Sequence, residues 1–271
     1  DAWWYPHGLP RAARGLDVLH CPTFRGPVRS DVPVVVTVHD LAVLRHPETF
    51  NQWTRHYSRL AVPRVARAAR RLIAVSEFTR GEIVELLGVP AERIDVIPNA
   101  VGAPFVPDGP AREGEYVLAV GTLEPRKNLG AAQEAARRVG LPLKVVGARG
   151  WGGVQVDGWL GRVSDEELAA LFRGARCLVY PSLYEGFGIP VLEAMACGTP
   201  VVTSAGGSTE EVAGGAAVLV DARDPATVAE GIEEAIGRRD ELRAQGLVRA
   251  AQFTWDRVAA ETRAVYERAA A

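Results

Sequence analysis

The chain is poor in the features that mark secreted and membrane-spanning proteins. Its 271 residues include three cysteines, an odd number, and two of them lie inside apolar runs typical of core elements. Unpaired, buried thiols in a reducing cytosol are the expected state. No apolar run is long enough to span a bilayer, and no signal-peptide pattern opens the chain. We therefore expect a cytoplasmic protein.

Net charge and lysine are also scarce. The formal net charge is −2, which does not favour nucleic acid as a partner. Only Lys127 and Lys144 are lysines among 31 cationic residues, a bias that a GC-rich bacterial genome would produce. Lys127 stands out because it follows Arg126 in the segment EPRKN. An ammonium suits a point contact to phosphate, and a guanidinium can bind it with two donors. No cluster has metal-ligand spacing, so we expect neither metal nor cofactor.

Strand-like and helix-like runs alternate along the chain, which predicts an α/β protein with parallel sheets and crossover helices. Helix starts are well marked: Ser164–Glu167 forms a capping box, and Asp224 precedes a first-turn proline. The predicted strands are 17–21, 34–38, 71–75, 94–97, 116–120, 143–146, 176–180, 200–203 and 217–220. The predicted helices are 52–69, 77–87, 128–139, 168–173, 225–238 and 255–269.

The most informative segment contains two carboxylates, Glu185 and Glu193, separated by seven residues. It follows the strand 176–180 and leads into a helix predicted over 190–196. Glycines between them let a ligand approach the bare backbone, and the helix start offers unpaired N–H groups to an anion. Acceptor carboxylates at such a turn could hold the hydroxyls of a sugar and a ribose. The segment therefore predicts a nucleotide-sugar site.

These residues belong to longer motifs, YPSLYEGFGIPVLEAMACGTPVVT at 180–203, VGTLEPRKNL at 120–129, VHDL at 38–41 and IAVSEFT at 73–79. Together they resemble the signature of retaining glycosyltransferases of family 4. The resemblance implies the GT-B architecture, with two Rossmann-like domains and a last helix that crosses back to the first. The corresponding ranges are 1–102 for an acceptor-side domain, 103–114 for a linker, 115–253 for the donor domain and 254–271 for the crossing helix.

The resemblance also implies roles for individual residues. Glu185 would face the hydroxyls of the donor sugar and Glu193 would hold the ribose. Arg126 and Lys127 would neutralise the diphosphate leaving group, which otherwise needs a metal ion. The backbone of the turn would complete the sugar contacts, and the loop after the strand 116–120 would line the donor site. The residues concerned are Gly186, Phe187, Gly188, Ile189, Gly121 and Thr122. Thr122 stands where many members carry an arginine, so Arg126 is expected to supply that charge.

Two features of the first domain have alternative interpretations. His39 directly follows the strand 34–38, at the edge where ligands bind in parallel sheets, and the resemblance implies a role near the donor sugar. A structural histidine is the alternative. The segment 53–71 is basic, and its apolar residues fall at helical spacing, namely Trp53, Tyr57, Leu60, Ala61, Val65 and Ala68. We expect these apolar residues to pack on the sheet beneath a solvated face. The alternative is a surface that contacts an anionic membrane or acceptor.

The expected function is metal-independent, retaining transfer of a hexose of mannose or glucose type. The donor would be a nucleotide diphosphate sugar such as GDP-mannose or UDP-glucose, and the acceptor a saccharide or a lipid-linked hydroxyl compound. The opening strand and glycine-rich turn of the family are not found, so the first domain is expected to be incomplete. The alternative is therefore a nucleotide-sugar-binding module that is non-catalytic or depends on a partner. A nucleotide-sugar 2-epimerase is a third possibility, but its additional acid–base carboxylates are not identified.

Overall fold

The computed structural model describes residues 4–271, except for the side chain of Pro6. The chain forms two compact units. The first contains the residues up to Asn99 together with Asp256–Ala271, and the second contains Ala100–Trp255. Residues 103–114, expected to be a linker, are therefore part of the second unit. Arg173 holds them there, because its Nε donates to the Pro110 carbonyl at 2.7 Å.

The first unit has a four-stranded parallel sheet with strands in sequential order, β1-β2-β3-β4. The predicted strand over Val34–Val38 has those bounds, and all five of its residues are buried. The strands are β1 (Leu19–Cys21), β2 (Val34–Val38), β3 (Arg71–Ala74) and β4 (Ile94–Val96). The helices are η1 (Trp4–Gly8), α1 (Leu9–Ala12), α2 (Ala42–Arg45), η2 (Pro47–Thr49), α3 (Gln52–Ala68), α4 (Glu77–Leu87) and η3 (Ala91–Arg93).

Local capping fixes the start of α3 and both ends of α4. The Asn51 side chain accepts from the Thr54 amide at 2.9 Å and starts α3. The Ser76 hydroxyl accepts from the Thr79 amide at 3.0 Å and starts α4, which ends at the left-handed Gly88. Short polar side chains at the N-cap and glycine after the last turn satisfy backbone groups that the helix leaves unpaired.

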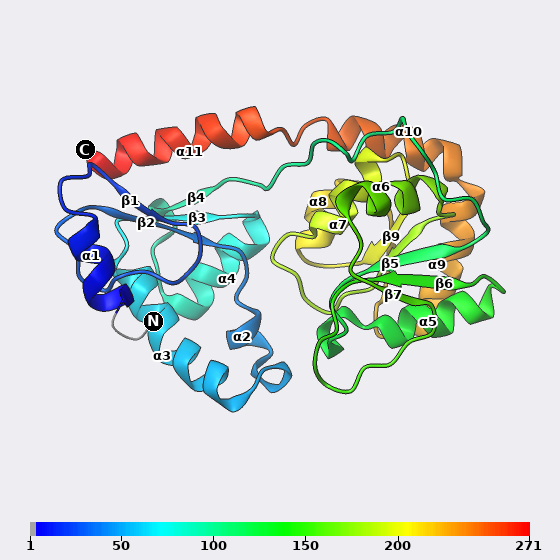
Figure 1. Cartoon of the computed structure of the whole chain (residues 1–271), viewed down its shortest axis with the longest axis horizontal. Coiled ribbons are helices and arrows are strands. Elements are labelled where there is room, and N and C mark those ends of the chain that lie inside the picture. Colours follow the sequence, from blue (N-terminus) through cyan, green and yellow to red (C-terminus); the bar gives the residue numbers. More distant parts are fainter. Residues whose placement is uncertain (1–3) are drawn as a thin grey trace. The chain divides into compact units, whose positions relative to one another are not determined.

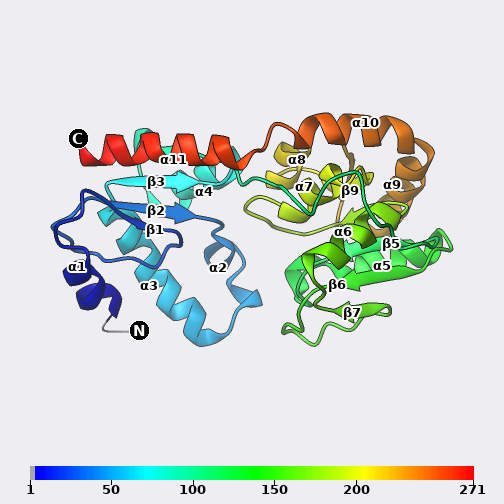
Figure 2. The same cartoon turned by 45° about the horizontal axis from the view of Figure 1, so that its top comes forward.

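The last helix, α11 (Trp255–Ala270), packs on the first unit, as predicted (Figure 1). Val265 is fully buried against Val35 and Ile73 of the sheet. The Tyr266 hydroxyl lies 2.6 Å from His20 Nδ1. Figure 2 shows the same helix along the sheet from a second direction. A residue from the far end of the sequence thus completes the core of a unit built mostly from the first 99 residues.

The buried face of α3 differs in part from the prediction, because Val65 is the one predicted apolar residue that is buried there. Trp53, Tyr57 and Leu60 are 76%, 44% and 47% exposed, so they do not pack on the sheet. The face that packs carries small and β-branched residues, Ser58, Val62, Val65 and Ala66. The helical period alone could not separate these two apolar stripes, which lie on opposite sides of the helix. Close packing on the sheet selects the smaller side chains, and the aromatic stripe is left exposed.

The second unit has a six-stranded parallel sheet with the order β10-β9-β8-β5-β6-β7. Its strands are β5 (Val117–Val120), β6 (Leu143–Val146), β7 (Trp159–Gly161), β8 (Leu178–Tyr180), β9 (Val201–Ser204) and β10 (Val218–Val220). Its helices are η4 (Pro125–Lys127), α5 (Leu129–Arg138), α6 (Asp165–Gly174), α7 (Ile189–Ala196), α8 (Ser208–Ala213), α9 (Pro225–Gly237) and α10 (Arg239–Ala250). The elements β7, α8 and α10 were not predicted.

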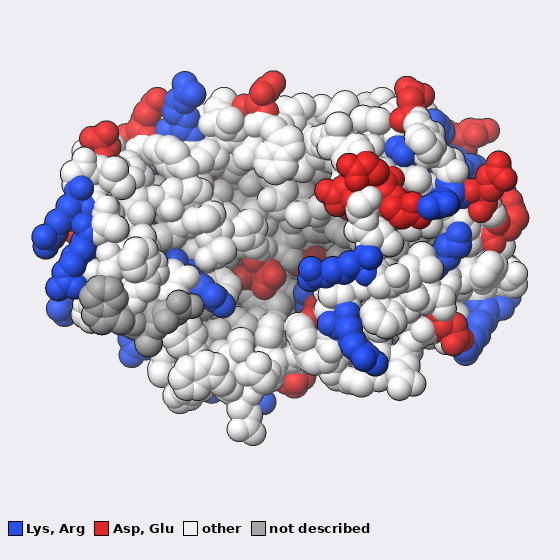
Figure 3. Space-filling model, in the orientation of Figure 1, with Lys and Arg blue, Asp and Glu red and all other residues white. Residues whose placement is uncertain are grey.

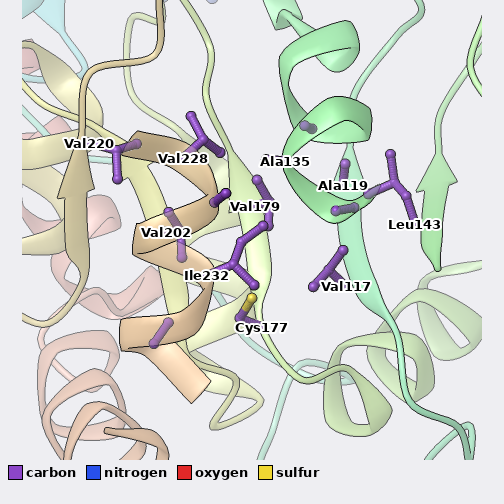
Figure 4. Close-up of a cluster of buried hydrophobic side chains, with 14 of the residues drawn as sticks. Val117, Ala119, Ala135, Leu143, Cys177, Val179, Val202, Val220, Val228 and Ile232 are labelled. Atoms are coloured by element: carbon purple, nitrogen blue, oxygen red, sulfur yellow. The ribbon is translucent and has the colours of Figure 1, made fainter. Parts of the chain in front are cut away.

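One face of this sheet is covered by α5 and α9, and their contact forms the core of the unit (Figure 4). Val117, Val179 and Val202 from three neighbouring strands meet Ala135 of α5 and Ile232 of α9, and all five are fully buried. The small alanines let the helices approach the valine-rich surface of the sheet closely. This packing fixes the strand ends from which the polar loops of the unit begin.

Candidate functional site

The candidate site lies where the strand order of the second sheet reverses. β5 is flanked by β6 on one side and by β8 on the other, so the loops after β5 and β8 leave the sheet in opposite directions. Such a switch point opens a crevice at the carboxyl ends of parallel strands. The loop after β5 carries Arg126 and Lys127, and the loop after β8 carries Glu185. The fold therefore brings together two motifs about 60 residues apart in the sequence.

Glu185 forms ion pairs with both predicted cations. Lys127 Nζ lies 2.6 Å from Glu185 Oε1, and Arg126 Nη1 lies 2.9 Å from Oε2. The side chains of Arg126 and Lys127 are each 13% exposed, and that of Glu185 is 10% exposed. Burial acts to raise the pKa of Glu185, but the attraction of Lys127 and Arg126 outweighs it and holds the pKa below its usual value. The carboxylate is therefore ionised at neutral pH.

Two further residues of this cluster were not predicted. Glu124 is buried, and its Oε1 accepts from Arg126 Nη2 at 2.7 Å. The Tyr180 hydroxyl lies 2.9 Å from Glu185 Oε1 and 3.0 Å from Lys127 Nζ. Burial and the charge of Glu185 raise the pKa of Tyr180, so the phenol keeps its proton. The sequence offered one signal for Glu124, which is its position two residues before Arg126. For Tyr180 the sequence indicated only the end of a buried strand.

The loops around Glu185 are tied to one another by side-chain bonds to the backbone. Asn128, in the left-handed conformation at φ 53°, donates to the Pro181 carbonyl at 3.2 Å and to the Ala222 carbonyl at 2.6 Å. The Ser208 hydroxyl donates to the Glu185 carbonyl at 2.7 Å. The loops that follow β5, β8, β9 and β10 are thereby held together, so the site is formed before any ligand binds.

Glu193 lies in α7 and has a different environment. Its side chain is half-buried and has no hydrogen-bond or ion-pair partner within the described part of the chain. Burial, with a contribution from the like charge of Asp165, raises its pKa to about 7. Asp165 belongs to the first turn of α6, where acidic side chains gather (Figure 3). A carboxylate without partners is free to accept hydrogen bonds from a ligand.

The turn between these carboxylates offers mainly its backbone. Gly188 has φ 104° and forms the N-cap of α7, a conformation that favours glycine. The Phe187 ring is buried in an edge contact with Phe253, at 6.0 Å between centroids, so any ligand contact at this position comes from its main chain. Ile189 is 44% exposed, and the Gly186 backbone lies between these residues and Glu185. α7 begins at Ile189, one residue before the predicted start.

The loop after β5 begins with Gly121 and Thr122, which are both half-buried. A Cβ at Gly121 would lie 3.1 Å from the Lys127 side chain, so glycine leaves room for the ammonium chain to pass. The next loop of the sheet also presses on this segment, because a Cβ at Gly147 would lie 1.9 Å from the Gly121 carbonyl oxygen. Thr122 is contacted by this next loop as well, because a Cβ at Gly150 would lie 2.7 Å from its methyl carbon, and its role in lining the donor site stays a prediction.

His39 lies in the first unit, whereas Glu185, Glu193, Arg126 and Lys127 lie in the second. It follows β2 at the carboxyl edge of its sheet, and its exposed ring places Nε2 2.9 Å from the Pro22 carbonyl. Asp40 Oδ1 accepts from the Ala42 amide at 2.9 Å, in the turn that leads into α2. The structure thus places His39 where predicted in its own sheet, and its role near a donor sugar stays a prediction.

Residues 4–271 contain neither a candidate membrane-spanning helix nor a candidate metal-binding cluster. No helix there combines the length and apolar character required to cross a bilayer. No group of three or more His, Cys, Asp and Glu side chains in this range is arranged to hold a metal ion.

Comparison with known proteins agrees with the fold. Residues 107–246 match the family described as "Glycosyl transferases group 1", and residues 1–103 match "Glycosyltransferase Family 4". The chain therefore belongs to the group 1 glycosyltransferases, which are enzymes of GT-B architecture.

Individual relatives extend over most of the chain. The O-antigen chain mannosyltransferase B of Escherichia coli is 34% identical over 92% of this chain and 74% of its own length. The D-inositol 3-phosphate glycosyltransferase of Frankia alni is 32% identical over 85% of this chain and 67% of its own length. The structure of Anabaena HepE in complex with UDP and glucose aligns with a TM-score of 0.77 at 21% identity, over 96% of this chain and 79% of that one. The two curated relatives are both named as enzymes that transfer sugars.

Proposed function

We propose that the protein transfers a hexose from a nucleotide diphosphate sugar to a hydroxyl acceptor, with retention of anomeric configuration and without a metal ion. The observation that carries the proposal is the buried cluster of Glu185, Lys127 and Arg126 at the switch point of the second sheet. Mannose and glucose are the sugars to test first. The mannosyltransferase name of one relative and the UDP and glucose bound to Anabaena HepE support this choice.

The two cations account for the leaving group. When the bond between the anomeric carbon and the diphosphate oxygen breaks, negative charge grows on that phosphate. Lys127 and Arg126 are preorganised in a nearly dry site, where positive charge stabilises such a transition state most effectively. In the same cluster, Glu124 and Glu185 balance the charges of both cations. The protein can thus supply the charge that a divalent ion supplies in other phosphate-transfer sites.

The two carboxylates would act on different parts of the donor. Glu193 has no partner in the described chain and would accept the ribose hydroxyls. Glu185 would accept hydroxyls of the hexose, close to the anomeric carbon where positive charge develops. The acceptor oxygen would bond to the anomeric carbon on the face that the diphosphate leaves, and its proton would pass to the departing phosphate oxygen. No side chain then needs to form a covalent intermediate.

The proposal is tested by incubating the protein with GDP-mannose or UDP-glucose in excess chelator. Transfer to a saccharide acceptor, or slow hydrolysis of the donor, should proceed with most of the rate kept, and the product should have the anomeric configuration of the donor. A rate abolished by the chelator and restored by Mn²⁺ or Mg²⁺ would refute metal independence. A protein that binds nucleoside diphosphate but turns over neither donor, with any acceptor, would indicate the alternative of a binding module.

We also propose that α3 binds an anionic membrane surface. Trp53 and Tyr57 are stacked at 6.4 Å between ring centroids, and both are exposed. They line an apolar groove of about 550 Å³, and no acidic residue occurs between Glu48 and Glu77. Exposed aromatic side chains on a basic helix match the interface of an anionic bilayer. The proposal rests on the exposure of Trp53, Tyr57 and Leu60, which we had expected to be buried against the sheet.

Vesicle co-sedimentation tests this surface. The protein should bind vesicles rich in anionic phospholipid and only weakly bind neutral ones. Each basic residue near such a surface contributes about 1 kcal/mol, so Arg55→Gln with Arg59→Gln should weaken binding about 30-fold. Trp53→Ala should also weaken it, whereas the matched control Trp255→Ala, at an exposed tryptophan of α11, should not. Equal losses in the two tryptophan variants would contradict the assignment to α3.

A further inference from the structure

Tyr180 is the last residue of β8, and its hydroxyl lies between the two charged groups on which the proposed function rests. Lys127 Nζ is 3.0 Å from the phenol oxygen, and Glu185 Oε1 is 2.9 Å from it. The side chain is buried, and these two protein groups satisfy the hydrogen bonding of its hydroxyl. The ammonium also lies 5.3 Å from the centre of the tyrosine ring, within the range of a cation–π contact.

The direction of these hydrogen bonds follows from the chemistry of the groups. A lysine ammonium has only donors, so Nζ donates to the phenol oxygen. An ionised carboxylate has only acceptors, so the single phenol hydrogen is donated to Glu185. The result is a directed chain from Lys127 through Tyr180 to Glu185. It can form only while the phenol keeps its proton and the carboxylate is ionised.

We propose that Tyr180 is a positioning residue that orients both the phosphate-binding Lys127 and the sugar-facing Glu185. A lysine side chain has four rotatable bonds, and the ring together with the hydroxyl restricts where its ammonium can lie. An arriving diphosphate competes with Glu185 for that ammonium. When the ammonium turns to the phosphate, the phenol remains as the donor to Glu185 Oε1 while Arg126 remains on Oε2, so the carboxylate keeps a partner on each oxygen.

This inference extends the proposed function, because it assigns a role to a residue that need not touch the donor. Replacement of Tyr180 by phenylalanine removes one oxygen and leaves the packing of the ring in place. Loss of a charge-assisted hydrogen bond should weaken nucleoside diphosphate binding about tenfold. Binding of the bare nucleoside should not change. Tyr116→Phe is the matched control, because Tyr116 is an equally buried tyrosine of the same unit whose hydroxyl donates to the Leu171 carbonyl at 2.8 Å.

A second measurement tests the inference without donor or turnover. The charged and titratable groups that face Glu185 are Lys127 and Arg126 from η4 and Tyr180 from β8, the Ser182 hydroxyl also lies near it, and Glu124 balances Arg126. Removing the phenol donor should raise the pKa of the Glu185 carboxyl, which can be followed by ¹³C NMR of the free protein. Arg126 and Lys127 remain in both tyrosine variants, so any difference between the variants comes from the phenol. Tyr116→Phe should leave the Glu185 pKa unchanged, because the Tyr116 hydroxyl bonds to Leu171 instead.

The outcomes separate the two proposals. The positioning role is supported if the Glu185 pKa rises in Tyr180→Phe but not in Tyr116→Phe. If the wild type binds nucleoside diphosphate, Tyr180→Phe should also lose affinity for the diphosphate and not for the nucleoside. An unchanged Glu185 pKa in Tyr180→Phe overturns it, and so does equal diphosphate binding by the wild type and Tyr180→Phe. A wild-type protein that binds no nucleoside diphosphate refutes the proposed function instead, and the carboxyl titration still decides the role of Tyr180.

Discussion

Protonation of Glu193 should control how tightly the protein binds a nucleoside near neutral pH. The pKa of this carboxyl is raised to about 7, mainly by burial and further by Asp165. Ribose hydroxyls donate hydrogen bonds, so they favour the ionised form of Glu193. The affinity for the nucleoside should therefore be highest well above pH 7. It should fall as the pH drops through the pKa of Glu193 in the free protein. Binding near pH 7 should also release protons, because the ligand selects the ionised form.

The size of the effect follows from the titration curve. With a pKa of about 7, the ionised fraction falls from about nine-tenths at pH 8 to about one-tenth at pH 6. Affinity should then fall about tenfold, or ~1.4 kcal/mol, over these two pH units. At pH 7 each binding event should release about half a proton. Titration calorimetry in two buffers with different ionisation enthalpies measures both quantities.

Two variants identify the group responsible. Glu193→Gln cannot ionise, so its affinity should be weak and flat over this pH range, and its binding should release no proton at this position. Asp165→Asn removes a like charge from α6 and should move the midpoint of the wild-type pH dependence to lower pH. If the wild type and Glu193→Gln show the same pH dependence and the same proton release, Glu193 does not contact the ligand, and our reasoning on the ribose is wrong.

Three further results are expected. Lys127→Ala should weaken nucleoside diphosphate binding by about 1.5–3 kcal/mol and leave the bare nucleoside unaffected, and equal calorimetric losses for the two ligands would exclude a phosphate contact. Glu185→Gln should lower kcat about 100-fold or more in steady-state assays, because it acts where charge develops, and a near-native kcat would remove the central role of this residue. Val265→Ala, in the contact of α11 with the first sheet, should lower the free energy of unfolding in urea by about 2 kcal/mol. The exposed control Val248→Ala should change it little, and equal effects would show that α11 adds no packing energy.

Most of the regular elements could be predicted because their signals are local. The strand over 34–38 is a run of apolar and β-branched residues, and the helix over 77–87 starts at Ser76 and ends before Gly88. The elements that were missed lack such signals. β7 consists of three residues, none of them fully buried, and the N-cap residue of α10, Arg238, makes no side-chain cap. Their structure depends on neighbours in the fold rather than on sequence pattern.

The sequence predicted those residues of the candidate site that belong to recognisable motifs. The motifs placed Glu185 and Lys127 on two different loops, and the strand order that makes these loops adjacent appears only in the folded sheet. The exposure of the aromatic stripe on α3 could not be predicted either, because periodicity indicates that a face is apolar but not whether the sheet is large enough to cover it. The separation of Glu193 from any partner likewise depends on its surroundings in three dimensions.

The position of α11 has a consequence for how the protein is made. The first unit takes its strands from the beginning of the chain but needs Val265 and Ala269 to close its core. The second unit is continuous from Ala100 to Trp255. During synthesis, which runs from the N-terminus, the strands of the first unit emerge before the second unit, but the core of the first unit is completed only after it. The strands of the first unit must therefore wait, with apolar surface uncovered, until the second unit has been synthesised.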